Sequence, residues 1–301
     1  MKRQILVLAT AGAVLFAACG SDSTSSPAET TAAAADTTTA AGGDAKSCAD
    51  GKTLEAGSLT IATGDPAFPP YVVDDKPESG QGFESALALA VAKELGFEGD
   101  TVKWVRTSFD TAVAGDDKTF DFNLQQFTIN ADRQKVVSFS DPYYTANQAL
   151  IGYTDGPAAS VKSIADLKKL KLGAAAGTTS LSYINDVIQP EAEAFTFNSN
   201  ADAATALDNK QIDAIISDLP TAIFWANAGA EFGGIDNTKV FGQFPLGDQG
   251  GDQWGLLFTK DNPLVECANI ALATLASSGD LEKLTTEWMS NYTEAPTLPE
   301  S

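Results

Sequence analysis

Histidine is absent from all 301 residues of the chain. Its absence excludes every Ser-His-Asp and Cys-His arrangement for nucleophilic catalysis and every zinc site with histidine ligands. The sequence also lacks a GxGxxG segment, a phosphate-binding GxxxxGK[ST] loop and an EF-hand calcium loop. Carboxylates and lysines remain available for proton transfer, but the sequence predicts no catalytic residue, no metal site and no cofactor.

Positive charge is scarce as well. The chain has 19 lysines and arginines against 40 aspartates and glutamates, so its formal net charge is −21. Such a chain is repelled by nucleic acids and by anionic membrane surfaces. Because no stretch is rich in lysine or arginine, we exclude a nucleic-acid partner.

The first 18 residues have the pattern of an export signal. Lys2 and Arg3 precede an apolar run from Ile5 to Ala18, which is too short to span a bilayer comfortably. Small residues then precede Cys19, and this ending resembles a bacterial lipoprotein processing site, at which the cysteine becomes the lipidated first residue. We therefore expect residues 1–18 to be a lipoprotein signal peptide. The exported protein would be anchored through Cys19 at the outer face of the cytoplasmic membrane, or lie in the periplasm. An ordinary secretory signal cleaved nearby is the alternative.

Aromatic residues, valine, isoleucine and leucine are missing from residues 20–46, which are mainly Ser, Thr, Ala, Asp and Gly. A segment of this composition cannot bury enough apolar surface to fold. We expect residues 19–50 to be a flexible linker between the lipid anchor and the folded region.

Cysteine occurs three times, and two cysteines remain once Cys19 is assigned to the anchor. An exported protein reaches a compartment that permits disulfides. Our hypothesis is that Cys48 and Cys267 are paired, which would attach the start of the folded region to a late helix. Two unpaired thiols are the alternative.

From residue 58 onward, short apolar runs typical of strands alternate with amphipathic runs typical of helices. The alternation predicts an α/β fold with mostly parallel sheets, and it occurs in two successive sets. The expected strands are residues 58–63, 101–105, 120–124, 136–144, 148–153, 171–176, 194–197, 212–217 and 255–258. The expected helices include residues 82–95, 163–169, 201–209, 263–278 and 281–289.

A polar stretch, residues 121–144, joins two of these strands and contains Arg133. An arginine offers a planar, bidentate fork that fits a carboxylate, which a lysine does not. Taken by itself, the stretch favours a surface arginine paired with Asp132.

Ligands of open α/β sheets bind beyond the carboxyl ends of the strands. Both sets of strands are followed by residues suited to a site, namely Asp65, Phe68, Gln125, Thr179 and Asp218. Groups that favour an anion, such as Arg133, would then share one cleft with acids. This combination points to a zwitterionic ligand.

Several short motifs follow one another along the chain. They are FPPY at residues 68–71, Gly82-Phe83-Glu84, the run from Thr128 to Arg133, the run from Phe139 to Tyr144, Gly177-Thr178-Thr179, Asp213-Ala214 with Asp218, and a closing helix with Trp288. In this order and spacing they resemble the family 3 extracellular solute-binding proteins, the amino-acid-capturing components of bacterial ABC importers. The resemblance covers roughly residues 58–292.

The resemblance implies a clamshell of two lobes, joined by two crossing strands near Thr145 and Trp254. One lobe would comprise residues 51–145 and 254–293, and the other residues 146–253. Residues 294–301 would be a C-terminal tail.

The resemblance also implies how the ligand's head group is held. Arg133 would grip its carboxylate, assisted by Thr179 and by amides near Thr128. Asp218 would accept its α-ammonium group. Paired charges in a closed cleft of low dielectric attract each other far more strongly than charges on a surface.

The ligand's side chain would lie between Phe68 and Phe109, with Asp65 near its far end in members that prefer cationic ligands. Small residues are usual in the family at the positions of Gln125 and Gln126. This departure predicts a tighter pocket or recognition of a polar side chain.

We therefore expect a monomer that captures an L-amino acid, with a polar or cationic side chain favoured, and delivers it to the permease of an ABC transporter. One alternative is a dehydratase acting on a small carboxylic acid, with Asp65 or Asp218 as the proton carrier. A second alternative is an accessory protein that signals ligand capture.

Overall fold

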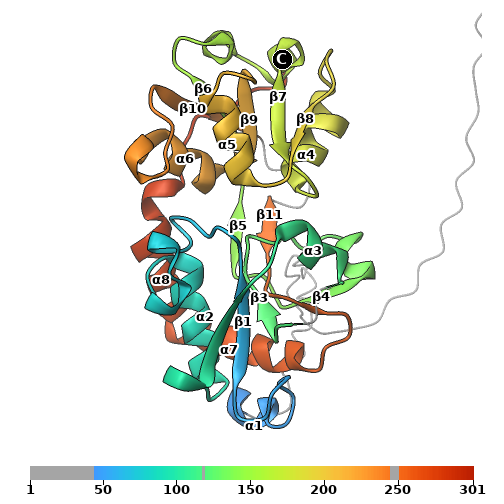
Figure 1. Ribbon diagram of the computed structural model, residues 1–301, viewed down its shortest axis with the longest axis vertical. Helices are drawn as coiled ribbons and strands as arrows, with labels where there is room; N and C mark the ends of the chain where they lie inside the picture. The colour runs from blue at the N-terminus through green and yellow to red at the C-terminus, as the bar shows by residue number, and fades with distance from the viewer. Residues whose placement is uncertain (1–43, 117–118, 245–250) are drawn as a thin grey trace, which may run out of the picture. The chain divides into compact units, whose positions relative to one another are not determined.

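The computed structural model describes residues 44–116, 119–244 and 251–301. The predicted signal peptide, the predicted anchor Cys19 and most of the predicted linker lie outside the described residues. The described part contains two five-stranded sheets and one two-stranded sheet (Figure 1).

The first five-stranded sheet and its helices form lobe 1. Its strands, in spatial order, are β2 (Val102–Arg106), β1 (Leu59–Thr63), β3 (Phe122–Asn123), β12 (Leu257–Thr259) and β4 (Val137–Phe139). Its helices are α1 (Ala45–Ala49), α2 (Phe83–Glu94), α3 (Phe109–Ala114), α7 (Leu264–Ser278) and α8 (Asp280–Met289). All five residues of β1 are buried, as in a strand covered on both faces.

The second five-stranded sheet and its helices form lobe 2. Its strands, in spatial order, are β10 (Thr238–Gln243), β6 (Gln148–Tyr153), β9 (Ala214–Asp218), β7 (Leu172–Ala175) and β8 (Phe195–Phe197). Its helices are α4 (Thr179–Tyr183), α5 (Asn200–Asp208) and α6 (Leu219–Asn227). Because β6 lies inside the sheet, one apolar cluster packs on Ile151 and another on Leu150, on opposite faces.

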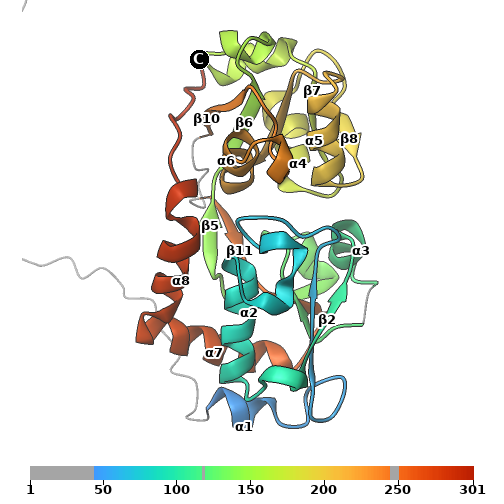
Figure 2. The same ribbon diagram turned by 60° about the vertical axis from the view of Figure 1, so that its left-hand side comes forward.

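Two short strands connect the lobes. They are β5 (Tyr144–Ala146) and β11 (Asp252–Trp254), which pair antiparallel with Thr145 opposite Gln253. The figures show this pair between the two large sheets (Figures 1 and 2). Thr145 and Trp254 are the residues near which we expected the crossings.

In each large sheet four of the five strands run in the same direction, in agreement with the expectation of mostly parallel sheets, and one strand is reversed. In lobe 1, β1 runs parallel to β2 and β3, whereas β12 runs antiparallel to β3 and β4. In lobe 2, β6 runs antiparallel to β9 and β10. The reason is that β12 and β6 continue directly from the crossing strands. They therefore start at the cleft, where the parallel strands end.

The predicted strand over residues 136–144 is two strands, β4 and β5. Between them the Ser140 hydroxyl accepts the Leu256 amide (2.9 Å) and donates to the Asp141 carbonyl (2.8 Å), and Pro142 removes an amide donor. The expected helix over residues 163–169 is a 3₁₀ helix, Ile164–Lys169. Strand β10, at the edge of its sheet, was not predicted.

Residues 44–50 are not flexible linker, contrary to our expectation. Asp44 caps α1 by accepting the Ser47 amide (2.7 Å), and Ala45 and Ala49 are buried. A disulfide joins Cys48 on α1 to Cys267 on α7, which is the pairing of our hypothesis. This covalent link explains why five residues with little apolar surface are held in a helix.

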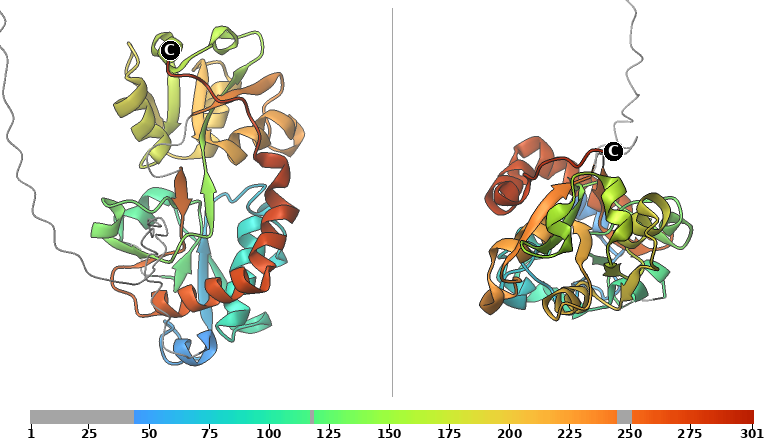
Figure 3. Two further views of the ribbon diagram at one scale, coloured as in Figure 1. Left: turned by 180° about the vertical axis from the view of Figure 1, so that it is seen from behind. Right: turned by 90° about the horizontal axis from the view of Figure 1, so that it is seen from above.

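The C-terminal residues 294–301 do not end on lobe 1. We call them the C-terminal strap, because they run back along lobe 2 (Figure 3). The Gln243 amide donates to the Pro296 carbonyl and the Leu298 amide donates to the Gln243 carbonyl, both at 2.8 Å. The Leu298 side chain is 5% exposed in the core of lobe 2. The strap is therefore a third covalent connection between the lobes.

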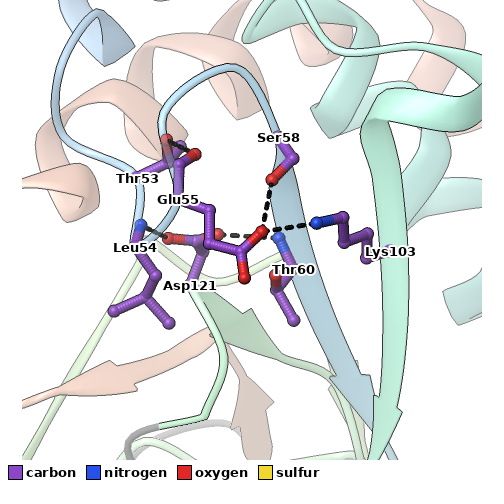
Figure 4. A network of polar contacts seen from close by, with 7 residues as sticks. All are labelled: Thr53, Leu54, Glu55, Ser58, Thr60, Lys103 and Asp121. Carbon is purple, nitrogen blue, oxygen red and sulfur yellow. Dashed lines mark hydrogen bonds and ion pairs between the residues drawn. The ribbon is translucent and has the colours of Figure 1, made fainter.

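A buried carboxylate organises the end of lobe 1 that lies away from the cleft. Asp121 accepts the amides of Leu54 and Thr60, both at 2.7 Å, and so ties the turn before β1 to the start of β3 (Figure 4). Glu55 and Lys103 form an ion pair beside it. Burial raises the pKa of Asp121. This network is structural, because the opposite ends of β1 and β3 carry the predicted site.

Candidate functional site

One cavity lies at the carboxyl ends of the strands of both lobes. Its lining includes all nine residues predicted to contact a ligand, namely Asp65, Phe68, Phe109, Gln125, Gln126, Thr128, Arg133, Thr179 and Asp218. Lobe 1 contributes the first seven and lobe 2 the last two. The topological expectation that these residues meet at one place agrees with this geometry.

Arg133 is fixed on lobe 1 by backbone and side-chain contacts. Its amide donates to Asn130 Oδ1 (2.9 Å), which holds the short turn Arg133–Lys135. Its guanidinium donates to the carbonyls of Thr128 (2.7 Å) and, across the cleft, Gly177 (3.0 Å), and lies 5.2 Å from the centre of the Phe109 ring. The side chain therefore points into the cavity and is not a surface residue.

The guanidinium of Arg133 is buried without an ion-pair partner in the described part of the chain. Asp132, the alternative partner, pairs with Lys135 instead (2.6 Å). Burial lowers the pKa of Arg133 to about 10, and the charges of Asp252 and Asp218 partly oppose that shift. The arginine thus remains cationic at neutral pH and presents its fork to the cavity.

Asp218 forms the acidic side of the cavity. It ends β9 and begins α6, where the Leu219 amide is held by the Asn147 carbonyl (2.7 Å). Its Oδ1 accepts the amide Nε2 of Gln148 at 2.6 Å. Burial, followed by the charge of Asp252, raises the pKa of Asp218 to about 8. A cation placed here would therefore favour the ionised carboxylate.

Thr179 lies at the first residue of α4, after a turn whose Gly177 has a positive φ of 71°. Thr178 caps the helix by accepting the Leu181 amide (3.2 Å). The Thr179 hydroxyl donates to Asp252 Oδ2 at 2.8 Å. The residue is therefore placed beside the cavity by a carboxylate of the crossing strand β11.

Gln125 and Gln126 differ in their contacts. Gln125 is buried and donates its Nε2 to Asn123 Oδ1 (3.1 Å). Gln126 has a positive φ of 52° and donates both its backbone amide (2.8 Å) and its side-chain amide (2.5 Å) to the buried carboxylate of Glu84. The side-chain amides of both glutamines are thus used within the protein, that of Gln126 by Glu84 and that of Gln125 by Asn123.

Glu84 lines the same cavity and connects it to the first crossing strand. The Tyr143 hydroxyl, one residue before β5, donates to Glu84 Oε1 (2.5 Å). Burial raises the pKa of Glu84 to about 7, although its hydrogen bonds act in the opposite direction. The cavity is therefore lined by a second acid besides Asp218, and this one is buried.

The two predicted aromatic walls have different surroundings. Phe109 stacks on Phe127 within lobe 1, with ring centres 5.0 Å apart. Phe68 lies against Phe224 and Trp225 of lobe 2, at 6.3 and 6.4 Å. Phe68 thus also takes part in contact between the lobes, which the sequence did not predict.

The loop after β1 carries Asp65 and Phe68. It is held by the start of α2, where the Phe83 amide donates to the Pro70 carbonyl (2.8 Å). Asp65 is exposed at the rim of the cavity. Its carboxylate can therefore meet only the outer end of a bound molecule.

Sequence reasoning missed three polar residues: Glu84, which lines the cavity, and Gln148 and Asp252, which contact residues of its lining. Glu84 stands in one of the recognised motifs, Gly82-Phe83-Glu84, which was the available signal. Gln148 and Asp252 are 104 positions apart, yet Gln148 Nε2 donates to Asp252 Oδ2 at 2.7 Å. Their positions close to the predicted crossings, at the first residue of β6 and the first residue of β11, were the only signal for them.

The model of the bacterial extracellular solute-binding proteins, family 3, matches residues 59–291. The chain belongs to that family. The family and the two-lobed α/β fold predicted from the sequence are thereby confirmed.

Named relatives of this family 3 protein cover most of its length. ABC transporter arginine-binding protein 1 of Escherichia coli (strain K12) is 27% identical over 223 residues, 73% of this chain and 86% of that protein. The L-cystine-binding protein TcyJ of the same strain is 28% identical over 254 residues, 82% of this chain and 90% of that protein.

A solved structure also matches. It is the ancestral amino acid-binding protein AncCDT-1, a precursor of cyclohexadienyl dehydratase. It is 31% identical, has a TM-score of 0.63, and the match covers 77% of this chain and 95% of that chain.

Among the residues that the structure describes, no group of three or more His, Cys, Asp or Glu side chains is arranged to hold a metal ion. Within the same residues, no helix has the length and apolar character needed to span a membrane.

Proposed function

We propose that the cleft of this family 3 protein binds an L-amino acid and that the protein delivers it to the permease of an ABC transporter. The observation that carries the proposal is the presence of Arg133 and Asp218 in the lining of one cavity. The guanidinium has no carboxylate partner among the described residues. The α-carboxylate of an amino acid would pair with Arg133, and its α-ammonium group would pair with Asp218. Arginine- and cystine-binding relatives support this assignment.

Capture requires movement of the lobes. Contacts already join them in this structure, because Tyr71 and Thr221 share a hydroxyl hydrogen bond (2.9 Å) and Arg133 bonds Gly177 across the cleft. The cavity volume of about 100 Å³ is below the ~300 Å³ at the lower end of typical small-molecule pockets. The lobes therefore separate for entry, and the ligand favours closure by binding the closed state more tightly.

The side chain of the ligand is proposed to be polar or cationic. Glu84 and Gln125 line the cavity and Asp65 lies at its rim, whereas the basic residue Arg133 would be engaged by the ligand's α-carboxylate. An acidic side chain would meet these carboxylates unfavourably.

We also propose that the protein is exported and held at the outer face of the cytoplasmic membrane through Cys19. The family description, extracellular solute-binding proteins, supports export. All nine cavity residues come from one chain, so a monomer suffices for binding. Release of labelled protein from membranes by a Cys19→Ser substitution would test the anchor.

A dehydratase remains the second candidate, because AncCDT-1 is a precursor of such an enzyme. Asp218 would then supply a proton to a cyclic carboxylic acid held by Arg133. Incubation with cyclohexadienyl acids, followed by mass spectrometry, separates the two: a binding protein returns its ligand unchanged. A sensing role would require a receptor in place of a permease as the partner.

The test of the main proposal is a thermal-shift screen of the twenty amino acids, cystine and ornithine, followed by calorimetry. A ligand that binds only the folded state raises the melting temperature. We expect stabilisation by at least one polar or cationic amino acid and none by its α-amide or its N-acetyl derivative, since each lacks one charge of the head group. Equal stabilisation by these derivatives would contradict the proposed head-group site.

A further inference from the structure

Asp252 lies on the crossing strand β11, outside the cavity lining, and yet contacts two polar groups of the site. Its Oδ2 accepts the Thr179 hydroxyl (2.8 Å) and the Gln148 side-chain amide (2.7 Å). Thr179 lines the cavity, and Gln148 is bonded to Asp218, which also lines it. Asp252 therefore supports both lobe 2 residues that are expected to hold the head group: it contacts Thr179 directly and Asp218 through Gln148.

The side-chain amide of Gln148 bridges Asp252 and Asp218 and is held in one orientation. Its side chain is 8% exposed, and its amide oxygen accepts the Ser180 hydroxyl (2.6 Å). Its Nε2 must then face the two carboxylates, Asp218 at 2.6 Å and Asp252 at 2.7 Å. A flipped amide would place its oxygen against both carboxylates and leave the Ser180 donor without an acceptor.

We propose that Asp252 is a positioning residue for head-group binding: it holds Thr179 and, through Gln148, Asp218 in their binding orientation and ties both to the crossing strands. The proposal rests on the proposed function of the cleft. Asp252 pairs with Ala146 in the β5–β11 ladder, two residues from Trp254, which is fully buried. Capture of an ammonium group by Asp218 therefore acts on a strand that takes part in lobe movement.

The charge of Asp252 has a separate effect from its hydrogen bonds. The charged and titratable groups that act on Asp218 are Asp252, Arg133, Glu84 and the phenols of Tyr71, Tyr143 and Tyr144. After burial, the Asp252 charge contributes most to raising the pKa of Asp218. Removing that charge while keeping an acceptor should therefore move the ionisation of Asp218 to lower pH.

The experiment compares Asp252→Ala and Asp252→Asn with the unmodified full chain. Asp186→Ala is the matched control, because its carboxylate is exposed on the helix that follows α4. Calorimetry with L-arginine as the probe is run from about pH 5 to pH 9, around the pKa of Asp218, which lies at about 8. We expect Asp252→Ala to weaken binding about 10-fold or more, since the buried Gln148 amide and the partly buried Thr179 hydroxyl lose an acceptor.

Asp252→Asn should bind with an affinity close to that of the wild type. The decrease of affinity on the acidic side of the pH profile should also move to lower pH in this variant. A wild-type affinity for Asp252→Ala would overturn the proposal. So would an Asp252→Asn variant as weak as Asp252→Ala with an unshifted pH profile.

A second measurement needs no ligand. In the unliganded protein, the pH at which stability falls through ionisation of Asp218 should lie lower in Asp252→Asn than in the wild type, and an unchanged midpoint counts against the proposal. If the wild type binds no amino acid of the screen while this midpoint shifts, the proposed function fails and the coupling of Asp252 to Asp218 stands.

Discussion

The two lobes hold their halves of the cleft by different means. Lobe 1 has a disulfide at its far end and a large continuous core cluster, and it presents Arg133 on a short turn held by backbone contacts. Lobe 2 lacks a disulfide among its described residues, and it depends on the C-terminal strap and on a carboxylate from the crossing strand. The anion-binding half is thus built into its own lobe, whereas the cation-binding half depends on segments that enter from outside.

The largest effect should come from removing Arg133, the carboxylate-binding residue of lobe 1. Arg133→Ala should weaken amino-acid binding at least about 100-fold, because a carboxylate in the cleft would lose its charged, bidentate partner. Isothermal calorimetry measures the loss, and circular dichroism checks the fold. Lys135→Ala removes a neighbouring exposed charge and should leave affinity unchanged. An affinity of Arg133→Ala within threefold of the wild type would show that the two halves of the cleft have been assigned wrongly.

The disulfide should matter for stability and little for binding. Replacing Cys48 and Cys267 by serine opens a link between residues 219 positions apart, and we expect a loss of about 2–5 kcal/mol of unfolding free energy. Denaturant unfolding with and without the bridge gives the value. Ligand affinity should stay the same, since α1 lies at the far end of lobe 1 from the cleft (Figure 1). A weakened affinity at full folding would mean that the two ends of lobe 1 are coupled.

The C-terminal strap should stabilise lobe 2 as the disulfide stabilises lobe 1. Leu298→Ala removes a side chain that is 5% exposed, so we expect a loss of about 2–4 kcal/mol through the cavity that it leaves. Leu54→Ala, at a leucine that is 54% exposed, is the matched control and should cost far less. Hydrogen exchange should localise the loss to lobe 2. Equal losses of stability in the two variants would show that the strap does not stabilise lobe 2.

The smallest effect concerns pH. The folded-state pKa of Asp218 is raised from 3.8 to about 8, so the unfolded chain releases this proton first. The contribution of Asp218 to stability therefore declines as pH rises from about 4 to about 8. Asp218→Asn should flatten this part of the stability–pH curve and weaken ligand binding. An unchanged slope would place the raised pKa elsewhere, with Glu84 the next group to test.

The sequence predicted the residues that line the cleft better than the residues that hold them in place. Strand ends and motifs were sufficient to place Arg133, Thr179 and Asp218 at one cavity, because residues after parallel strands share an edge of the sheet. The hydrogen bonds of Gln148 with Asp252 join segments 104 positions apart, and no local pattern reports such a contact.

Other errors have the same physical origin. Residues 45–49 read as linker because their composition is polar and small, yet a distant cysteine and helix α7 keep them folded. The reversed directions of β6 and β12 depend on their entry from the crossing strands, and the alternation of strands and helices does not contain that information. Long-range tertiary contacts overrode local preference in each case.

The strap also fixes where the two ends of the folded unit lie. The first described residues, at α1, are on lobe 1, and Ser301 follows a segment packed on lobe 2 (Figures 1 and 3). A donor fluorophore near Asp44 and an acceptor after Ser301 would thus report on different lobes. Energy transfer between them would follow lobe closure directly, without a label inside either core.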